Sequence, residues 1–165
     1  MGSFPYQLHG LSASELTGFL KDHPWQGLNV TIPYKKDAYA LADSVSEDAQ
    51  AVGAANTLVK DVNGFIAADN TDVYGFEYLV KSLKINLSQK KAMVFGAFGG
   101  AGQAICYALK KGGAFVVGVS RNPHESSSYV DCAITYDQIK SHYDANLLVN
   151  ATPIGMFPHA GVSPL

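Results

Sequence analysis

Two charged residues of opposite sign stand where a chain can do proton chemistry. Lys35 follows the end of a predicted strand and Asp72 lies at the start of a predicted helix, both of them edges where functional groups gather. An ammonium and a carboxylate that meet there could form a proton-handling pair. Taken singly, each is more typical of a surface charge or a helix cap, because spacing alone does not show that they meet. Nearby strand ends carry Asn29, Thr31 and Asn56, which could hydrogen-bond a polyol or satisfy loop backbone.

A glycine-rich turn is the second place where chemistry is expected. An all-apolar strand at 92–95 runs into Gly96-Ala97-Phe98-Gly99-Gly100-Ala101-Gly102, a predicted helix follows, and residues 114–119 form another buried strand. This order is the βαβ unit of a nucleotide-binding fold. Glycines let backbone N–H groups approach a pyrophosphate, and the helix N-terminus favours an anion. The glycines fall three residues apart rather than in a strict GxGxxG, so a turn built for packing alone stays an alternative.

Arg121 ends the second buried strand, roughly twenty residues after the glycine turn. Chains that bind NAD usually carry Asp or Glu at this point, where the carboxylate holds the ribose hydroxyls. A guanidinium can instead pair with a 2′-phosphate through two hydrogen bonds. The residue type therefore favours NADP over NAD, and a solvated surface arginine is the alternative.

Composition narrows the function classes. The 165 residues are 47% apolar and 16% charged with a net charge of −2, which is ordinary for a globular chain and gives no basic field for nucleic acid or an anionic membrane. The longest aliphatic runs fall far short of the ~20 residues that cross a bilayer. Two cysteines are too few for a disulfide framework, and the five histidines lack metal-ligand spacing. We expect a protein of the reducing cytoplasm that binds no metal, and small or uncharged partners remain possible.

The elements of the first half must position Lys35 and Asp72. The capping box Ser12-x-x-Glu15 predicts a helix over about 13–21, and Asn63-Gly64 predicts an antiparallel hairpin. The other predicted elements are strands at 4–8 and 28–32, with alternating Phe4, Tyr6 and Leu8 in the first, a helix at 36–42, hairpin strands at 55–59 and 65–68, and a helix from Asp72. The expected inward residues are Leu16, Phe19 and Leu20 in the first helix and Phe76, Leu79, Val80 and Leu83 in the last.

The second half reads as an incomplete doubly wound sheet. The helix after the glycine turn should carry Ala101, Ile105, Ala108 and Leu109 inward. Residues 136–143 are expected to form another helix and residues 147–149 another strand, while residues 85–89 are the expected interdomain linker. Apart from the hairpin, strands and helices alternate along the chain, so the predicted fold class is α/β.

Four motifs in order along the chain resemble the shikimate dehydrogenase family. They are Asn29-Val30-Thr31-Ile32-Pro33-Tyr34-Lys35, Ala55-Asn56-Thr57-Leu58, Asn70-Thr71-Asp72-x-x-Gly75 and Asn150-Ala151-Thr152-Pro153-Ile154-Gly155-Met156. The resemblance implies NADP-dependent interconversion of 3-dehydroshikimate and shikimate in aromatic amino acid biosynthesis. It implies Lys35 and Asp72 as catalytic residues, Thr31 and Asn56 as substrate-binding residues, and a cofactor set of Gly96, Ala97, Gly99, Gly100, Ala101, Arg121 and Thr152.

The resemblance also implies a domain division and some departures. We expect an N-terminal α/β catalytic domain over residues 1–84 and a partial Rossmann-like NADP-binding domain over residues 88–165. Family members begin with a strand and a serine-containing loop that holds the substrate carboxylate, and they end with closing helices, so this chain is expected to be shortened at both ends. Phe98 is one residue extra in the glycine turn.

Two alternatives remain open at this point. One is a related enzyme that acts on quinate or uses NAD, and the other is a noncatalytic remnant that binds nucleotide or a partner protein. Without the closing helices of the family, apolar faces of the sheet would be uncovered, which predicts self-association or membership of a longer chain.

Overall fold

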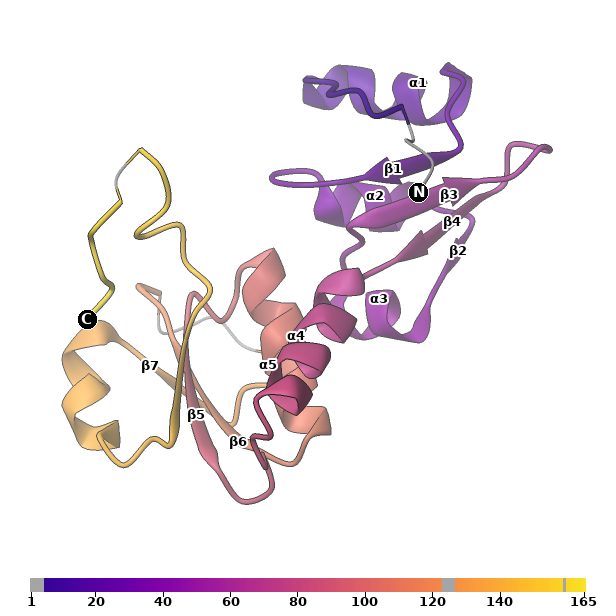
Figure 1. Cartoon of the computed structure of the whole chain (residues 1–165). Coiled ribbons are helices and arrows are strands. Elements are labelled where there is room, and N and C mark those ends of the chain that lie inside the picture. Colours follow the sequence, from indigo (N-terminus) through magenta and orange to yellow (C-terminus); the bar gives the residue numbers. More distant parts are fainter. Residues whose placement is uncertain (1–4, 123–126, 159) are drawn as a thin grey trace.

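The computed structural model describes residues 5–122, 127–158 and 160–165, and it contains two sheets that follow one another along the chain (Figure 1). The first half holds α1 (Ala13–Asp22), β1 (Gly27–Asn29), α2 (Lys35–Leu41), β2 (Ser44–Val45), α3 (Glu47–Val52), β3 (Thr57–Lys60) and β4 (Ile66–Asp69). The second half holds β5 (Lys91–Phe95), α5 (Gly100–Lys111), β6 (Phe115–Val119), β7 (Cys132–Ile134), the 3-10 helix η1 (Tyr136–His142) and β8 (Leu147–Asn150). Helix α4 (Thr71–Ser82) stands between the two sheets. The α/β class predicted from the sequence is confirmed.

The first sheet has the strand order β1-β3-β4-β2. Strands β3 and β4 form the predicted hairpin, because the Asp61 carboxylate accepts hydrogen bonds from the backbone N–H groups of Asn63 and Phe65 at 2.8 and 2.9 Å. Gly64 takes a φ of 87° in that turn, which favours glycine. Leu58 at the centre of β3 is fully buried, and α1 packs on the same core. The hairpin thereby sets where the chain leaves β4 and enters α4.

The second sheet is all parallel, with the order β7-β6-β5-β8. The last four residues of each central strand, 92–95 in β5 and 116–119 in β6, are apolar and buried, as expected for a strand that is covered on both faces. The last residue of β5, Phe95, lies opposite the last residues of β6 and β8, which are Val119 and Asn150. The loops that follow these three strands therefore leave the sheet at one edge, the edge where α/β folds bind ligands.

Three helices join the two sheets. Helices α3 and α4 both pack on α5, and Val73 of α4 forms a buried cluster with Ala104 and Ala108 of α5. The Lys111 ammonium of α5 reaches carboxylates on the other two helices, at 2.9 Å from Glu77 and 3.7 Å from Asp48. None of the helices in the described part of the chain has the length and apolar character to span a bilayer.

The structure differs from the predicted elements at the N-terminus and at β1. Residues 5–9 form no strand, and Tyr6 and Leu8 are exposed, while Phe4 lies outside the described residues. An alternating pattern makes a strand only where a neighbouring backbone pairs with it. The strand expected at 28–32 is confined to Gly27–Asn29, because the chain turns before Pro33, which has no N–H for a ladder.

The predicted inner faces of two helices were also wrong in part, and several short elements were not predicted. Leu79 in α4 and Leu83 directly after it are exposed. Val73 joins Phe76 and Val80 on the inner face of α4, because that face lies against α5 and not against the first sheet. Ala101 is exposed in the first turn of α5. The short elements β2, α3 and β7, which are two to six residues long, were not predicted from the sequence. The helix expected at 136–143 is a 3-10 helix.

Candidate functional site

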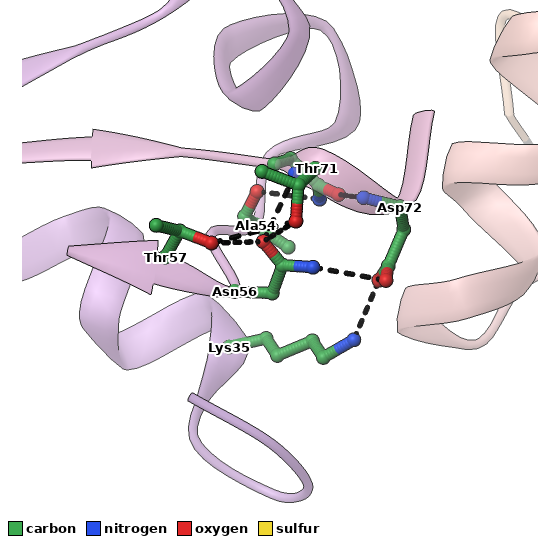
Figure 2. Close-up of polar contacts among 7 residues, drawn as sticks. Lys35, Ala54, Asn56, Thr57, Thr71 and Asp72 are labelled. Carbon is green, nitrogen blue, oxygen red and sulfur yellow. Dashed lines mark hydrogen bonds and ion pairs between the residues drawn. The ribbon is translucent and has the colours of Figure 1, made fainter. Parts of the chain in front are cut away.

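Lys35 and Asp72 meet, as Figure 2 shows. The Lys35 ammonium lies 2.6 Å from Oδ2 of Asp72, and the two side chains are 17% and 34% exposed. Both residues lie at the N-terminus of a helix, since Lys35 is the first residue of α2 and Asp72 is in the first turn of α4. The pair is shielded on the protein side and reachable from solvent, which suits a group that passes a proton to a bound molecule.

A buried asparagine holds the start of α4. Asn70 is 1% exposed, and its amide donates to the Ala54 carbonyl oxygen at 2.9 Å. Its Oδ1 accepts from the backbone N–H of Asp72 at 3.2 Å, as a helix cap does. The backbone N–H of Ala55 in turn donates to the Lys35 carbonyl oxygen at 2.8 Å. The segment before β3 therefore ties the starts of α2 and α4 together, which brings the two charges into contact.

Asn56 joins the pair through its side-chain amide. Its Nδ2 donates to Oδ1 of Asp72 at 2.9 Å, so the carboxylate uses one oxygen for Asn56 and the other for Lys35 (Figure 2). Thr31 stands apart from this network, exposed in the turn after β1, where its carbonyl oxygen accepts from the backbone N–H of Tyr34 at 3.0 Å. Asn29 donates to the Tyr6 hydroxyl at 3.4 Å. The structure thus gathers three of the five polar candidates.

The glycine turn is tightly packed. Gly96 has a φ of 74°, and a Cβ on it would lie 2.9 Å from Cγ2 of Thr152. A Cβ on Gly102 would lie 2.0 Å from the Gly96 carbonyl oxygen, so only glycine lets α5 begin this close to the turn. Phe98, the extra residue, is half-buried against the core of the second sheet. The insertion is thereby absorbed by packing on the protein side of the turn.

The other cofactor candidates lie at the same sheet edge or beside it. Thr152 follows β8, and its hydroxyl donates to Oδ1 of Asn150 at 2.6 Å. Arg121 follows β6 and is exposed, and no carboxylate in the described part of the chain pairs with it. Ala97 is fully buried, backbone included, whereas Ala101 is exposed at the start of α5.

The charged pair and the glycine turn are neighbours. A Cβ on Gly100, the first residue of α5, would lie 3.7 Å from Cδ of Lys35. The first N–H groups of α5 have no partner within the helix and make its N-terminus a site for an anion. The Lys35–Asp72 ion pair and the N-terminus of α5 therefore lie next to each other, although they come from different halves of the chain.

Sequence reasoning missed three polar residues of this region. Thr57, Thr71 and Asn70 all hydrogen-bond within the network, and they lie inside the quoted motifs but were given no role. The preference of asparagine for helix caps was a signal for Asn70. Within the ranges that the structure describes, no three histidine, cysteine or acidic side chains come together in a way that could hold a metal ion.

Comparisons with known proteins agree with this geometry. The family model described as "Shikimate dehydrogenase substrate binding domain" matches residues 4–58. Shikimate dehydrogenase (NADP(+)) of Caldanaerobacter subterraneus subsp. tengcongensis is 35% identical over 153 residues, which cover 85% of this chain and 53% of that protein. The chain spans about half the length of the curated relatives it matches.

Solved structures give the same result. Shikimate 5-dehydrogenase from Thermus thermophilus in complex with NADP(H) and shikimate is similar with a TM-score of 0.79 and 35% identity, covering 94% of this chain and 59% of that one. Quinate dehydrogenase from Corynebacterium glutamicum in complex with NAD is similar with a TM-score of 0.77 and 31% identity, covering 93% and 58%. Fold, ordered motifs and relatives agree, and the chain belongs to the shikimate dehydrogenase family.

Proposed function

We propose that this chain binds NADP(H) and catalyses the reversible oxidation of shikimate to 3-dehydroshikimate, a step of aromatic amino acid biosynthesis. The observation that carries the proposal is the 2.6 Å ion pair between Lys35 and Asp72 beside the first residue of α5. The relatives named NADP(+)-dependent shikimate dehydrogenases support the choice of substrate and cofactor.

The residues at the edge of the second sheet fit a dinucleotide. The missing side chains at Gly96 and Gly102 let the turn and α5 approach each other, and the free N–H groups at the start of α5 suit a pyrophosphate. Arg121 offers an exposed guanidinium for a 2′-phosphate. The proposed cofactor-binding set comprises Gly96, Ala97, Gly99, Gly100, Ala101, Arg121 and Thr152.

The chemistry divides between cofactor and protein. The bound cofactor supplies the site for the hydride that leaves or joins the substrate carbon. During reduction the Lys35 ammonium gives a proton to the carbonyl oxygen and becomes the neutral amine, and during oxidation the neutral amine takes the proton from the substrate hydroxyl and becomes the ammonium. Asp72 holds the Lys35 side chain in place by charge and a hydrogen bond. Asn56 steadies Asp72, and Asn56 and Thr31 contact the substrate hydroxyls.

We propose that the two sheets carry the two parts of this task. Residues 1–84 form the substrate-binding and catalytic domain, and residues 88–165 form the NADP-binding domain. The match of the substrate-domain family model to residues 4–58 supports the first assignment. The parallel sheet with its glycine turn supports the second. Packing of α4 on α5 connects the two parts directly.

An absorbance assay for reduced nicotinamide tests the proposal, with shikimate or quinate combined with NADP or NAD. The proposal expects turnover with shikimate and NADP above the other three pairs. Turnover with quinate and NAD would assign the chain to the activity named for its Corynebacterium relative. NADP binding without turnover of any pair would support a nucleotide-binding remnant instead.

The Arg121→Ala variant tests the cofactor choice. Loss of a charge-assisted pair costs about 1.5–3 kcal/mol, so NADP affinity should fall by more than tenfold while NAD affinity stays nearly constant. Isothermal titration with each cofactor measures the two values. Equal losses for NADP and NAD would show that Arg121 does not read the 2′-phosphate.

We further propose that the chain works in the cytoplasm and self-associates. Both of its cysteines are free thiols, which supports a reducing compartment. A cavity of about 1250 Å³ lies between residues 5–11, α1 and β1, with Leu8, Phe19 and Leu28 among its apolar lining. We propose that a second copy covers this surface. A monomer that stays monodisperse at micromolar concentration in sedimentation velocity would contradict the self-association.

A further inference from the structure

The Asn56 side chain is held at its oxygen by two threonines. Its Oδ1 accepts the backbone N–H of Thr71 at 2.9 Å, the Thr57 hydroxyl at 2.9 Å and the Thr71 hydroxyl at 3.1 Å (Figure 2). A backbone N–H can only donate, so the atom that faces it must be the amide oxygen. The amide nitrogen then points to Asp72, whose ionised carboxylate can only accept.

This arrangement fixes the orientation of the amide from both ends. A flipped amide would place its NH2 group against the Thr71 N–H and its oxygen against the Asp72 carboxylate, and both contacts would repel. The two hydroxyls add donors that the backbone alone does not provide. The hydrogen bond from Asn56 occupies Oδ1 of Asp72, and this leaves Oδ2 for the Lys35 ammonium.

We propose that Thr57 and Thr71 are positioning residues that orient the Asn56 amide and, through Asp72, the Lys35 ammonium. Neither hydroxyl contacts Lys35 or Asp72 directly, so the effect passes through the amide. The two residues come from different elements, the first residue of β3 and the first residue of α4. The inference rests on the proposed function only for its kinetic consequence, because the orientation of the amide is a property of the free protein.

The double variant Thr57→Val/Thr71→Val removes both hydroxyls and keeps the side-chain shape. The matched variant Thr57→Ser/Thr71→Ser restores the hydroxyls, and Thr17→Val on the exposed side of α1 controls for a threonine change elsewhere. NMR of the side-chain NH2 group of Asn56, assigned with Asn56→Ala, reports its hydrogen exchange without substrate. We expect the NH2 hydrogens to exchange roughly tenfold faster or more in the double valine variant, because the Asn56 side-chain oxygen loses the two hydrogen bonds that it accepts from the threonine hydroxyls and the amide is held less firmly. The serine and Thr17 variants should match the unmodified chain.

Kinetics then separate positioning from fold and from function. The double valine variant should show a kcat roughly tenfold lower with shikimate and NADP, an unchanged NADP affinity, and rescue of kcat by the serine pair. Unchanged Asn56 exchange in the double valine variant would overturn the inference, as would failure of the serine pair to restore it. If the double variant does not fold, the single valine variants carry the same comparison. If the unmodified chain has no turnover, the proposed function fails while the exchange data still decide the role of the threonines.

Discussion

Gly102 allows a sharp prediction about how the nucleotide edge is built. A Cβ at this position would lie 2.0 Å from the Gly96 carbonyl oxygen and 2.8 Å from the backbone carbon of Ala97, well inside the 3.4 Å of an ordinary contact. Both obstacles are backbone atoms, so no side chain can rotate away. The Gly102→Ala variant must therefore displace α5 from the turn, at a cost of about 1–3 kcal/mol or more for overpacking.

Gly75 in α4 provides the matched control. It is also a glycine inside a helix, but a Cβ there would meet nothing within 4 Å. Gly75→Ala should stabilise the fold by about 0.5–1 kcal/mol, because alanine loses less backbone entropy than glycine in a helix. The two variants are thus the same chemical change with opposite expected signs.

Urea denaturation followed by circular dichroism measures both variants. The midpoint should fall for Gly102→Ala and rise for Gly75→Ala, and Gly102→Ala should also weaken NADP binding because the start of α5 moves. A Gly102→Ala variant as stable as the unmodified chain would refute the close approach of α5 to the turn. Stabilisation of both variants would show that helix propensity alone governs these positions.

Two further predictions concern charges and thiols of the second sheet. Burial opposes the ionisation of Asp131, but hydrogen bonds from Lys110 and from the backbone N–H of Val116 outweigh it and hold its pKa below the usual value. The stability that this carboxylate contributes is therefore present above its unfolded pKa and is lost as the pH falls through the lower folded pKa. In Asp131→Asn the free energy of unfolding should fall less steeply at acid pH than in the unmodified chain. An acid limb parallel to that of the unmodified chain would contradict this. Burial raises the pKa of the Cys106 thiol to about 12. A thiol reagent at pH 8 should therefore label half-buried Cys132 and leave Cys106 unlabelled until the protein unfolds, which mass analysis of the peptides measures. Labelling of Cys106 in the folded chain would argue against its burial.

The sequence predicted the parts of the fold that local chemistry specifies. The capping box set α1, Asn63-Gly64 set the hairpin, and the glycine turn between two apolar runs set the βαβ unit. Each of these signals lies within a few residues of the structure it forms. The strand expected around Tyr6 was wrong because pairing requires a partner strand that no local pattern reveals.

The same distinction applies to the site. Lys35 and Asp72 could be chosen by type and position, but their contact depends on Asn70 and on the segment before β3, which act between distant parts of the chain. The inner face of α4 was misassigned at Leu79 because its partner is α5 rather than the sheet before it. Tertiary packing thus decided what periodicity left open.

The central claim is that Lys35 moves the proton in a site shared with the cofactor, and its neighbour Lys36 provides the control. Lys36 is exposed on the next position of α2, and no side chain in the described ranges forms an ion pair with it. The measurement is kcat for shikimate oxidation with NADP in the unmodified chain, Lys35→Met and Lys36→Met, with NADP affinity measured in parallel. We predict that Lys35→Met lowers kcat by about 10²–10⁴-fold, the range for a lost acid–base group, at constant NADP affinity, and that Lys36→Met leaves kcat within about twofold of the unmodified chain. Equal kcat values for the two variants would contradict the account, and so would an unmodified chain that binds NADP and turns over no shikimate.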